Sequence, residues 1–348
     1  MKSVVSYDGG ELRVEEVPVP AVSSPQDVLV KVVYSGLCGS DIPRVFYTGA
    51  HFYPITLGHE FSGHVVSAGS AVNDLAAGDA VACVPLLPCF ECEACRRHFF
   101  SLCRQYQFVG SRSAGGNAEY IVVKRLNLLK LPAGLSLLAG AFLEPITVGL
   151  HAIHLAGGCT GKHVVIIGAG TIGLLAMQCA RALGAASVSV LDINPDKLAL
   201  ALKTGADDAW HAGELTPAQI TGRMAQRQFD QLILETAGTA QTVALALEIA
   251  GPRAQISLVG TLHRDVLLNP TIFGHILRKE LRISGSWMNY SAPWPGEEWR
   301  QAVELLQDHA LDIEPLIASV EGFSEYVQSV AALQGRPMQG KIMLKVPE

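Results

Sequence analysis

The sequence predicts an α/β protein that combines a β-rich part with a doubly wound parallel sheet. Three observations predict this fold class. The chain has 348 residues, more than one ordinary domain usually holds. Up to about residue 140 it consists of short alternating runs separated by Gly, Pro and Asp turn signals. From about Leu150 onward, apolar strands alternate with helical stretches at the spacing of a parallel sheet.

Composition narrows the classes of function. With 49% hydrophobic and 17% charged residues, the chain has ample apolar surface for two cores. Its net charge of −6 is spread along the chain, without the basic stripe that nucleic-acid binding usually leaves. The segment from Met1 to Asp8 lacks the apolar core of a signal peptide. We therefore expect a cytoplasmic protein that has neither a nucleic acid nor a membrane as partner.

The β-rich part includes predicted strands at Asp27–Val33 and His64–Ser67. Near the end of the chain we expect a helix at about Trp299–Leu311 and a strand at Lys341–Val346. Because the parallel sheet lies in the middle of the chain, this terminal segment is expected to rejoin the first part. The predicted domains are residues 1–149 with 287–348, carrying a cysteine-rich lobe at about 84–108, and residues 150–286.

The central part predicts alternating strands and helices. The strands are Val164–Ile167, Val188–Asp192, Leu232–Glu235 and Ile256–Val259, and two of the helices are Leu174–Leu183 and Thr242–Ile249. The uncharged run Val164–Ala180 has a membrane helix as its alternative interpretation, but the run is short and glycines interrupt its first half. A buried strand that turns into a helix explains the run better.

A glycine motif joins the first central strand to its helix. The residues Gly168-Ala169-Gly170-Thr171-Ile172-Gly173 match G-x-G-x-x-G. The first glycine permits a tight turn, the second lets the backbone approach a pyrophosphate, and the third allows close packing of helix and strand. The helix N-terminus then binds the anion. A tight turn in a fold without cofactor is the alternative, but strand, motif and helix occur in the expected order.

An acidic residue follows at the expected distance. Asp192 ends the next strand, nineteen residues after Gly173. We expect it to accept hydrogen bonds from the adenosine ribose and to repel a 2′-phosphate, so the predicted cofactor is NAD. Lys197 is a candidate for the same ribose, or a solvated helix lysine. Val259 and Gly260 end a later strand at the edge where a nicotinamide ring would lie.

Four of the eight cysteines occur within fifteen residues. Cys89, Cys92, Cys95 and Cys103 have the spacing with which four thiolates enclose one tetrahedral ion, as structural zinc requires. An iron–sulfur cluster is the main rival, but the bacterial ferredoxin pattern places three residues and not seven before the last cysteine, with proline after it. A chance cluster of buried cysteines is the remaining alternative. We predict a structural zinc ion that holds this loop.

A second set of potential ligands is spread along the chain. Cys38 lies in Gly36-Leu37-Cys38-Gly39-Ser40-Asp41, His59 in Gly58-His59-Glu60, and Glu144 in Phe142-Leu143-Glu144-Pro145. None of these is diagnostic alone, because a lone cysteine is usually part of a core.

The pattern Gly58-His59-Glu60-x2-Gly63-x5-Gly69-x2-Val72 resembles the zinc signature of the medium-chain alcohol dehydrogenases. The four-cysteine lobe, the turn Gly78–Val81 and the central nucleotide fold follow in that family's order. The resemblance implies a β-rich GroES-like catalytic domain and a Rossmann NAD-binding domain. It also implies that Cys38 and His59 bind a catalytic zinc ion.

The third ligand distinguishes branches of that family. Where the simple alcohol dehydrogenases have a second cysteine, the matching segment here carries Glu144, as in the polyol dehydrogenases. Glu144 is therefore the expected third ligand, and Glu60 is expected to bind or approach the metal in some states. Ser40 resembles the hydroxyl proton relay of the family. Its alternative role is that of a turn hydroxyl capping Asp41.

The resemblance implies NAD-linked oxidation of a secondary alcohol on a polyol or a polyol phosphate. A phosphate group would bind Arg, Lys or backbone N–H groups. Candidates for substrate contact are Arg44, His51, Arg112, Trp287 and Asn289, with Met288 and Tyr290 walling the pocket; ordinary surface positions and core packing are the alternatives.

Two other functions remain open at this point. One is a dehydrogenase of free polyols or of L-threonine, which uses the same metal and cofactor. The other is a non-catalytic NAD-sensing protein with two structural zinc ions. The family resemblance also implies a homodimer, with a tetramer as the alternative.

Overall fold

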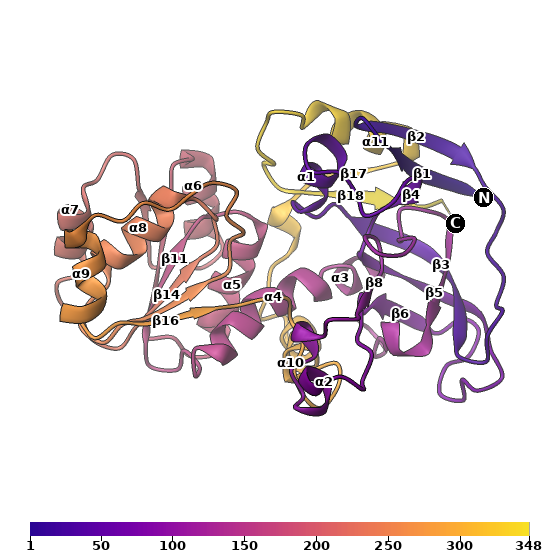
Figure 1. Cartoon of the computed structure of the whole chain (residues 1–348), viewed down its shortest axis with the longest axis horizontal. Coiled ribbons are helices and arrows are strands. Elements are labelled where there is room, and N and C mark those ends of the chain that lie inside the picture. The colour runs from indigo at the N-terminus through magenta and orange to yellow at the C-terminus, as the bar shows by residue number, and fades with distance from the viewer. Residues whose placement is uncertain (348) are drawn as a thin grey trace. The chain divides into compact units, whose positions relative to one another are not determined.

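The computed structural model describes residues 1–347, which form two compact units (Figure 1). The N-terminal unit consists of Met1–Glu144, Tyr290–Gln307 and the chain from Ile317 onward. The central unit consists of Pro145–Asn289 and Asp308–Leu316. The predicted domain boundaries at 149 and 287 stay predictions.

The N-terminal unit is built mainly of strands. They are β1 (Lys2–Tyr7), β2 (Glu11–Glu16), β3 (Asp27–Gly36), β4 (Ile55–Thr56), β5 (Glu60–Ala68), β6 (Ala80–Cys83), β7 (Leu86–Leu87), β8 (Gln107–Phe108), β9 (Tyr120–Lys124), β10 (Leu128–Lys130), β17 (Ile317–Glu321) and β18 (Lys341–Lys345). Its helical segments are α1 (Asp41–Phe46), α2 (Glu93–Arg96), η1 (Phe100–Leu102), η2 (Arg125–Asn127), α3 (Leu137–Gly140), α10 (Glu297–Gln307) and α11 (Phe323–Ala332).

The main sheet of this unit has the order β10-β6-β5-β3-β18-β17, with β9 also paired to β3. Strand β3 is central because Val28, Val30 and Val32 are fully buried on one face, the period-2 pattern of a half-buried strand. The last strand, β18, pairs antiparallel with β3, so that Met343 lies opposite Gly36. The end of the chain is therefore part of the sheet that carries the segment before Cys38.

The central unit contains a six-stranded sheet. Its strands are β11 (His163–Ile167), β12 (Ser187–Asp192), β13 (Asp208–His211), β14 (Gln231–Glu235), β15 (Gln255–Leu258) and β16 (Arg282–Gly285). Its helical segments are α5 (Thr171–Ala182), α6 (Pro195–Lys203), α7 (Pro217–Arg223), α8 (Ala240–Ile249), α9 (Pro270–Arg278) and η3 (Glu314–Leu316), and α4 (Leu143–Leu155) enters it from the N-terminal unit.

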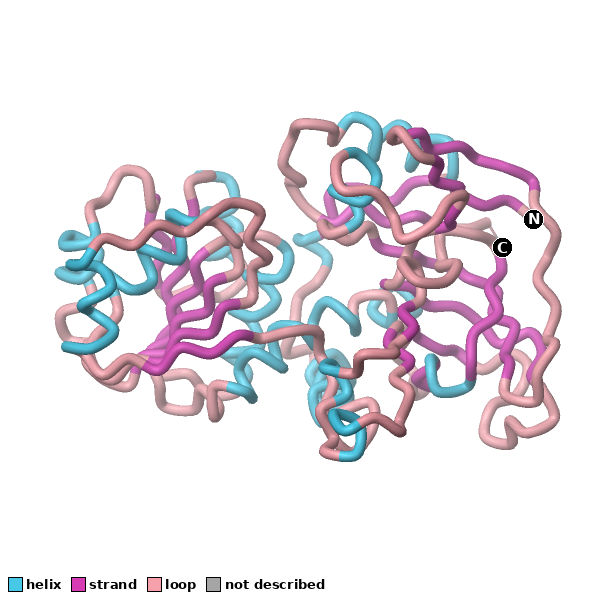
Figure 2. Tube along the Cα trace, viewed as in Figure 1, coloured by secondary structure: helices cyan, strands magenta, loops and turns pink. Residues whose placement is uncertain are grey.

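The strands lie in the order β13-β12-β11-β14-β15-β16, and all neighbouring pairs are parallel. From β11, the chain first adds strands on one side, β12 and β13, and then on the other side, β14 to β16. Figure 2 shows helices on both sides of these strands. Strand β14 is buried along its whole length, as expected when both faces of a parallel sheet are covered. This confirms the predicted fold class, since β-rich and doubly wound parallel parts are both present.

The run Val164–Ala180 forms β11, a turn and α5, as the strand-to-helix interpretation predicted. Among residues 1–347, no helix is long and apolar enough to span a bilayer. The helix predicted to reach Leu311 ends at Gln307. Two residues later His309 has a φ of 54°, a left-handed conformation that a right-handed helix does not continue through.

Candidate functional site

The four cysteines of the predicted structural zinc site gather in the loop around α2 and η1. The Sγ atoms of Cys89 and Cys103 are 3.5 Å apart, as are those of Cys92 and Cys95. The pairs Cys89–Cys95 and Cys92–Cys103 are 3.9 Å apart. A tetrahedral ion with zinc–sulfur bonds of about 2.3 Å requires sulfur–sulfur distances of about 3.8 Å. All four thiols are unoxidised, so the donor set fits zinc.

Backbone amides in this loop favour the thiolate form. The N–H of Cys92 donates to Cys89 Sγ at 3.3 Å, and the N–H of Cys89 donates to Cys103 Sγ at 3.3 Å. Amide donors, first that of Cys95, lower the pKa of the Cys92 thiol to about 6. Since the thiolate is the form that binds a metal, the loop is prepared for a cation.

Aromatic packing fastens the cysteine lobe to the segment before α10. The rings of Phe90, Phe100 and Trp294 contact each other edge to face, with centroids 5.3 to 5.7 Å apart. Trp294 stacks on Tyr290 at 5.3 Å, and the Tyr290 hydroxyl accepts a hydrogen bond from the N–H of Leu86 at 3.1 Å. The sequence interpretation missed Trp294, because its partners lie about 200 residues earlier in the chain.

A second cluster lies where β3 ends and β5 begins. The antiparallel register pairs Gly36 with Glu60, which brings the segment after β3 to the residue before β5. As a result, one ligand atom each of Cys38, His59 and Glu60 lies within 4.8 Å of the others. A thiol, an imidazole and a carboxylate form a donor set suited to zinc.

The imidazole of His59 lies near a buried carboxylate. Its Nδ1 lies 3.8 Å from Oδ1 of Asp41, and within residues 1–347 this buried nitrogen has no hydrogen-bond partner. Burial lowers the pKa of His59, but the charges of Asp41 and Cys38 outweigh it and raise this pKa to about 10. A metal ion at this position would therefore displace a proton from the imidazole.

Glu60 has a cationic partner that the sequence interpretation missed. Lys341 Nζ lies 2.5 Å from Glu60 Oε2 and also donates to the carbonyl of Leu37 at 3.2 Å. Only glycine fits at position 36, because an added Cβ would lie 2.6 Å from Glu60 Oε2. Burial lowers the pKa of Lys341, but the negative charges of Glu60, Cys38 and Glu144 and the hydrogen bond to Glu60 together outweigh it and raise this pKa above its usual value. The ammonium form of Lys341 is thus favoured at this buried position.

Glu144 lies at the start of α4 and is 8% exposed. Its charge contributes to raising the pKa of His59 and that of Lys341, so the carboxylate is near both groups. It is not one of the three residues whose ligand atoms lie within 4.8 Å of one another. The ligand set of Cys38, His59 and Glu144 therefore stays a prediction, and Glu60 is the carboxylate that the structure groups with the first two.

Ser40 is exposed beside Cys38. Its hydroxyl donates to Cys38 Sγ at 3.2 Å and accepts from Arg44 Nη1 at 2.9 Å. Ser40 stands at the N-cap of α1, but its side chain makes no capping hydrogen bond, so the alternative role of a turn cap is not seen. The same Arg44 nitrogen donates to Asp41 Oδ1 at 2.8 Å.

The other predicted substrate residues occupy different environments. His51 and Arg112 are exposed side chains of the N-terminal unit. Trp287 is 54% exposed in the central unit. Asn289 is fully buried, and its amide donates to Thr147 Oγ1 at 2.5 Å within the same unit. Their contact with a substrate stays a prediction.

The glycine motif of the central unit forms the turn between β11 and α5. Gly168 has a φ of 103°, which residues with a side chain rarely adopt. A Cβ on Gly173 would lie 1.8 Å from the Gly168 carbonyl, so the helix packs closely on the turn. A Cβ on Gly170 would meet nothing within 4 Å, so this backbone faces open space where a pyrophosphate could approach. Thr171 and Ile172 are the first residues of α5.

Asp192 is the last residue of β12, next to β11 in the sheet. Its carboxylate accepts hydrogen bonds from the N–H of Ala169 at 2.6 Å and of Asn194 at 2.9 Å. These contacts fix the carboxylate beside the glycine turn. Lys197 is in the first turn of α6, where Asn194 caps the helix.

The turns after β14 and β15 lie against each other. A Cβ on Gly260 would be 2.2 Å from the nitrogen of Gly238, and the N–H of Val259 donates to the Glu235 carbonyl at 2.8 Å. Glu235, which the sequence interpretation missed, is fully buried at the end of β14. Its Oε1 accepts from the N–H of Gly238 at 2.8 Å, while its Oε2 has no partner within residues 1–347. An acid at the end of a buried strand was the signal available in the sequence.

Comparisons with known proteins agree with both units. Residues 24–133 match the model of the alcohol dehydrogenase GroES-like domain, and residues 171–308 match that of the zinc-binding dehydrogenases. Galactitol 1-phosphate 5-dehydrogenase of Escherichia coli (strain K12) is 56% identical over 344 residues, which is 99% of each chain.

Solved structures lead to the same family. A crystal structure of galactitol-1-phosphate dehydrogenase from Escherichia coli matches with a TM-score of 0.98 over 99% of this chain and 100% of that one. A putative zinc-binding dehydrogenase from Sinorhizobium meliloti 1021 bound to NADP is 31% identical and matches with a TM-score of 0.90 over 99% of each chain. The chain therefore belongs to the zinc-dependent alcohol dehydrogenase family, whose members oxidise alcohols with a nicotinamide dinucleotide as acceptor.

Proposed function

We propose that this enzyme oxidises the secondary alcohol at carbon 5 of galactitol 1-phosphate to the ketone, giving tagatose 6-phosphate. The reaction converts one NAD⁺ to NADH and releases one proton. The observation that carries the proposal is the 56% identity to galactitol 1-phosphate 5-dehydrogenase along 99% of both chains. A relationship of this extent leaves no domain of either protein unmatched.

The catalytic metal site is proposed at the cluster around Cys38 and His59, with Glu144 or Glu60 as the carboxylate ligand. A zinc ion held there would supply Lewis-acid chemistry that lowers the pKa of the substrate hydroxyl, and a bound nicotinamide cofactor would serve as acceptor for the hydride from the substrate's hydroxyl-bearing carbon. The protein keeps the donor atoms in place through Asp41, whose carboxylate lies 3.8 Å from the His59 ring nitrogen.

Ser40 is the proposed proton acceptor. Its hydroxyl is exposed and lies 3.2 Å from Cys38 Sγ, so it can receive the proton of an alcohol bound beside that sulfur. Arg44 Nη1 donates to the same oxygen at 2.9 Å. This donor keeps a lone pair of the serine oxygen occupied and orients its O–H.

The second zinc ion is proposed at Cys89, Cys92, Cys95 and Cys103, where it would hold the lobe without reaching substrate. The cofactor is proposed to lie on the turn Gly168–Gly173 with its ribose at Asp192. A carboxylate at this position repels a 2′-phosphate, which supports NAD over NADP. Lys197, Val259 and Gly260 remain proposed contacts of the same cofactor.

A substrate comparison tests the function. Initial rates of NADH formation are measured with galactitol 1-phosphate, sorbitol, xylitol and L-threonine at equal zinc loading. We expect the highest kcat/KM with galactitol 1-phosphate. A higher kcat/KM with a free polyol or with threonine would replace the proposed substrate by that compound and leave the metal and cofactor chemistry in place.

The homodimer and the cytoplasmic location are further parts of the proposal. They rest on the family resemblance. Analytical ultracentrifugation of the zinc-loaded protein measures the first, with a dimer expected and a monomer or tetramer as the contrary results.

A further inference from the structure

The loop that carries Arg112 is fixed to the metal-site histidine. The N–H of Arg112 donates to the carbonyl of Phe108 at 2.8 Å, and the ring of Phe108 packs edge to face on His59 with centroids 5.5 Å apart. The base of the loop touches the residue before that histidine, since a Cβ on Gly110 would lie 2.5 Å from the Gly58 carbonyl. Arg112 therefore projects from a loop that is attached to the proposed catalytic site.

The guanidinium of Arg112 has no carboxylate partner within residues 1–347. It lies over the ring of Tyr106, 4.4 Å from the centroid, and its Nη2 donates to the Tyr106 hydroxyl at 3.3 Å. Stacking orients the planar group while leaving most of its N–H donors available. An oriented, exposed arginine without a counter-charge is suited to an anion.

Two further groups come from α1 and the segment after it: Arg44 lies within α1, and His51 follows it. Arg44 uses a single nitrogen, Nη1, for its contacts with Ser40 and Asp41. The Tyr53 hydroxyl accepts from the N–H of Ala50 at 2.9 Å and donates to the Arg44 carbonyl at 3.4 Å. This tyrosine ties the turn that contains His51 to the backbone of Arg44.

The charges of the three groups act on one another. Burial, and then the charges of Arg112 and Arg44, lower the pKa of His51. The Arg112 and Arg44 charges thus both disfavour protonation of this imidazole. Asp41, which is fully buried, is an acidic group in contact with this set, and of the three side chains it pairs with Arg44.

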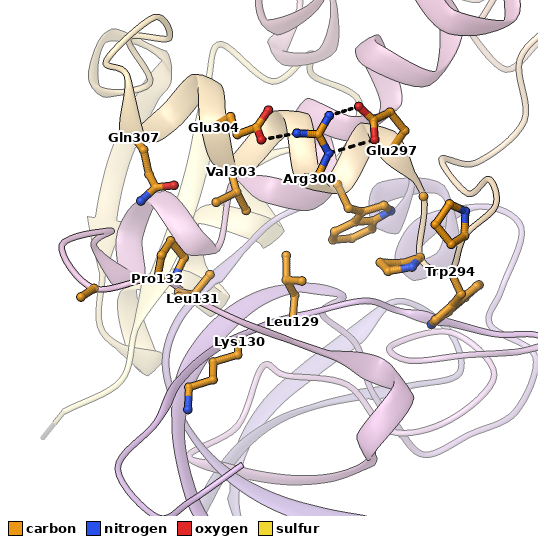
Figure 3. A pocket seen from close by; sticks show the side chains of 15 residues that line it. Leu129, Lys130, Leu131, Pro132, Trp294, Glu297, Arg300, Val303, Glu304 and Gln307 are labelled. Carbon is orange, nitrogen blue, oxygen red and sulfur yellow. Dashed lines mark hydrogen bonds and ion pairs between the residues drawn. The ribbon is translucent and has the colours of Figure 1, made fainter. Parts of the chain in front are cut away.

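Another arginine of the N-terminal unit gives the contrast. Arg300 lines a groove of about 720 Å³ between α10 and the segment Leu129–Ala133 (Figure 3). There the guanidinium is held between the carboxylates of Glu297 and Glu304. Its charge is already neutralised, so this groove does not offer an anion site.

We propose that Arg112, Arg44 and His51 form the subsite that holds the phosphate group of the substrate, with Arg112 as the main ligand. The proposal rests on the proposed function and adds the residues that distinguish a polyol phosphate from a free polyol. Six single bonds separate carbon 5 from the phosphorus of a hexitol 1-phosphate, a reach of about 7 Å when extended. A phosphate at that distance from the reacting carbon needs donors beside the metal cluster, where Arg44 is linked to Cys38 through Ser40.

Kinetics with matched substrates test this subsite. The wild type, Arg112→Gln and Arg112→Lys are compared for NADH formation from galactitol 1-phosphate and from galactitol. We expect R112Q to lower kcat/KM for the phosphate ester about 10- to 100-fold, mainly through KM, and to leave galactitol unchanged. R112K should fall between, because lysine lacks the planar pair of donors.

The matched control is Arg13→Gln, another arginine of this unit that stacks on a tyrosine, 5.0 Å from the centroid of Tyr7. R13Q should leave kcat/KM unchanged for both substrates. Equal losses for both substrates in R112Q, or no loss for either, would overturn the subsite.

A binding measurement separates this proposal from the proposed function. Inorganic phosphate is titrated into zinc-loaded protein and followed by ³¹P line width, with no turnover involved. Weaker binding in R112Q than in the wild type and R13Q supports the subsite, even if galactitol 1-phosphate proves not to be oxidised, in which case the proposed function alone fails. If galactitol 1-phosphate is oxidised but R112Q binds inorganic phosphate as tightly as the wild type does, the subsite is overturned and the proposed function stands.

Discussion

The ammonium group of Lys341 lies 2.5 Å from the carboxylate of Glu60, and the two side chains are only 3% and 1% exposed. They are separated by 281 residues in the chain, so this ion pair joins the start of β18 to the start of β5, next to His59. Two buried charges compensate each other only while both are present. Removing one of these two charges should therefore lower the free energy of unfolding far more than breaking an ion pair on the surface.

Lys341→Met should lower the free energy of unfolding by about 3–5 kcal/mol, because it leaves a buried carboxylate without a counter-charge. Urea denaturation followed by circular dichroism measures the loss. Glu60→Gln combined with Lys341→Met should recover most of it.

The control for this ion pair is Lys130→Met. This variant breaks the ion pair between Lys130, which is 51% exposed, and Asp79. It should lower the free energy of unfolding by at most about 1 kcal/mol. A loss in K341M no larger than that in K130M would show that the buried pair contributes nothing special.

The two zinc ions should leave the protein in a fixed order. A mild chelator is expected to remove the ion at Cys38 and His59 first and to abolish NADH formation, since an open catalytic site is easier to reach than four enclosing thiolates. The number of zinc ions released per chain is measured during chelation, together with the rate of NADH formation and the thermal unfolding temperature of the same samples. Cys95→Ser should retain one zinc and unfold at lower temperature, whereas Cys159→Ser, a buried cysteine of the central unit, should retain both. Unfolding before activity is lost would contradict the assignment of the two sites.

Asp192→Ser should shift the cofactor preference towards NADP. The ribose of NAD loses a charged acceptor, so kcat/KM with NAD should fall about 10- to 100-fold. With NADP it should rise, because the repulsion of the 2′-phosphate is gone. Asp196→Ser, four residues further on in the first turn of α6, is the control and should alter neither value. An unchanged NAD/NADP ratio in D192S would remove the basis for predicting NAD.

A titration tests whether the Arg112 side chain lies near His51. A nearby positive charge disfavours the imidazolium ion, so Arg112→Gln should raise the pKa of His51 towards its usual value. At a pH between the pKa of His51 in the wild type and its pKa in R112Q, His51 is then more protonated in the variant. NMR of the histidine ring protons follows this pKa directly. If it stays the same in R112Q and R13Q alike, the two side chains are not neighbours in solution.

Features that depend on local sequence were predictable. The spacing of the four cysteines fixes their gathering in one loop, and the sulfur–sulfur distances of 3.5 and 3.9 Å follow from that spacing. The glycine turn was also local, because Gly168 and Gly173 lie in one strand–turn–helix unit.

Features that depend on long-range packing were not predictable from one sequence. Lys341 reads as an ordinary lysine at the start of a strand, and only the pairing of β18 with β3 brings it to Glu60. Asn289 reads as a polar pocket residue, yet it is fully buried and bonded to Thr147, 142 residues away. Which carboxylate completes the metal site depends on side-chain positions of this kind.

The most direct test of the account is the combined zinc content and NADH formation of Cys38→Ala with galactitol 1-phosphate. Changing even an outer partner of a metal site commonly costs 10- to 100-fold, so loss of a ligand should reduce the rate at least about 100-fold. We expect the variant to keep one zinc per chain, bound by the four-cysteine loop, and to lose activity to that extent. Wild-type turnover in a variant with one zinc would contradict a catalytic metal at Cys38 and His59.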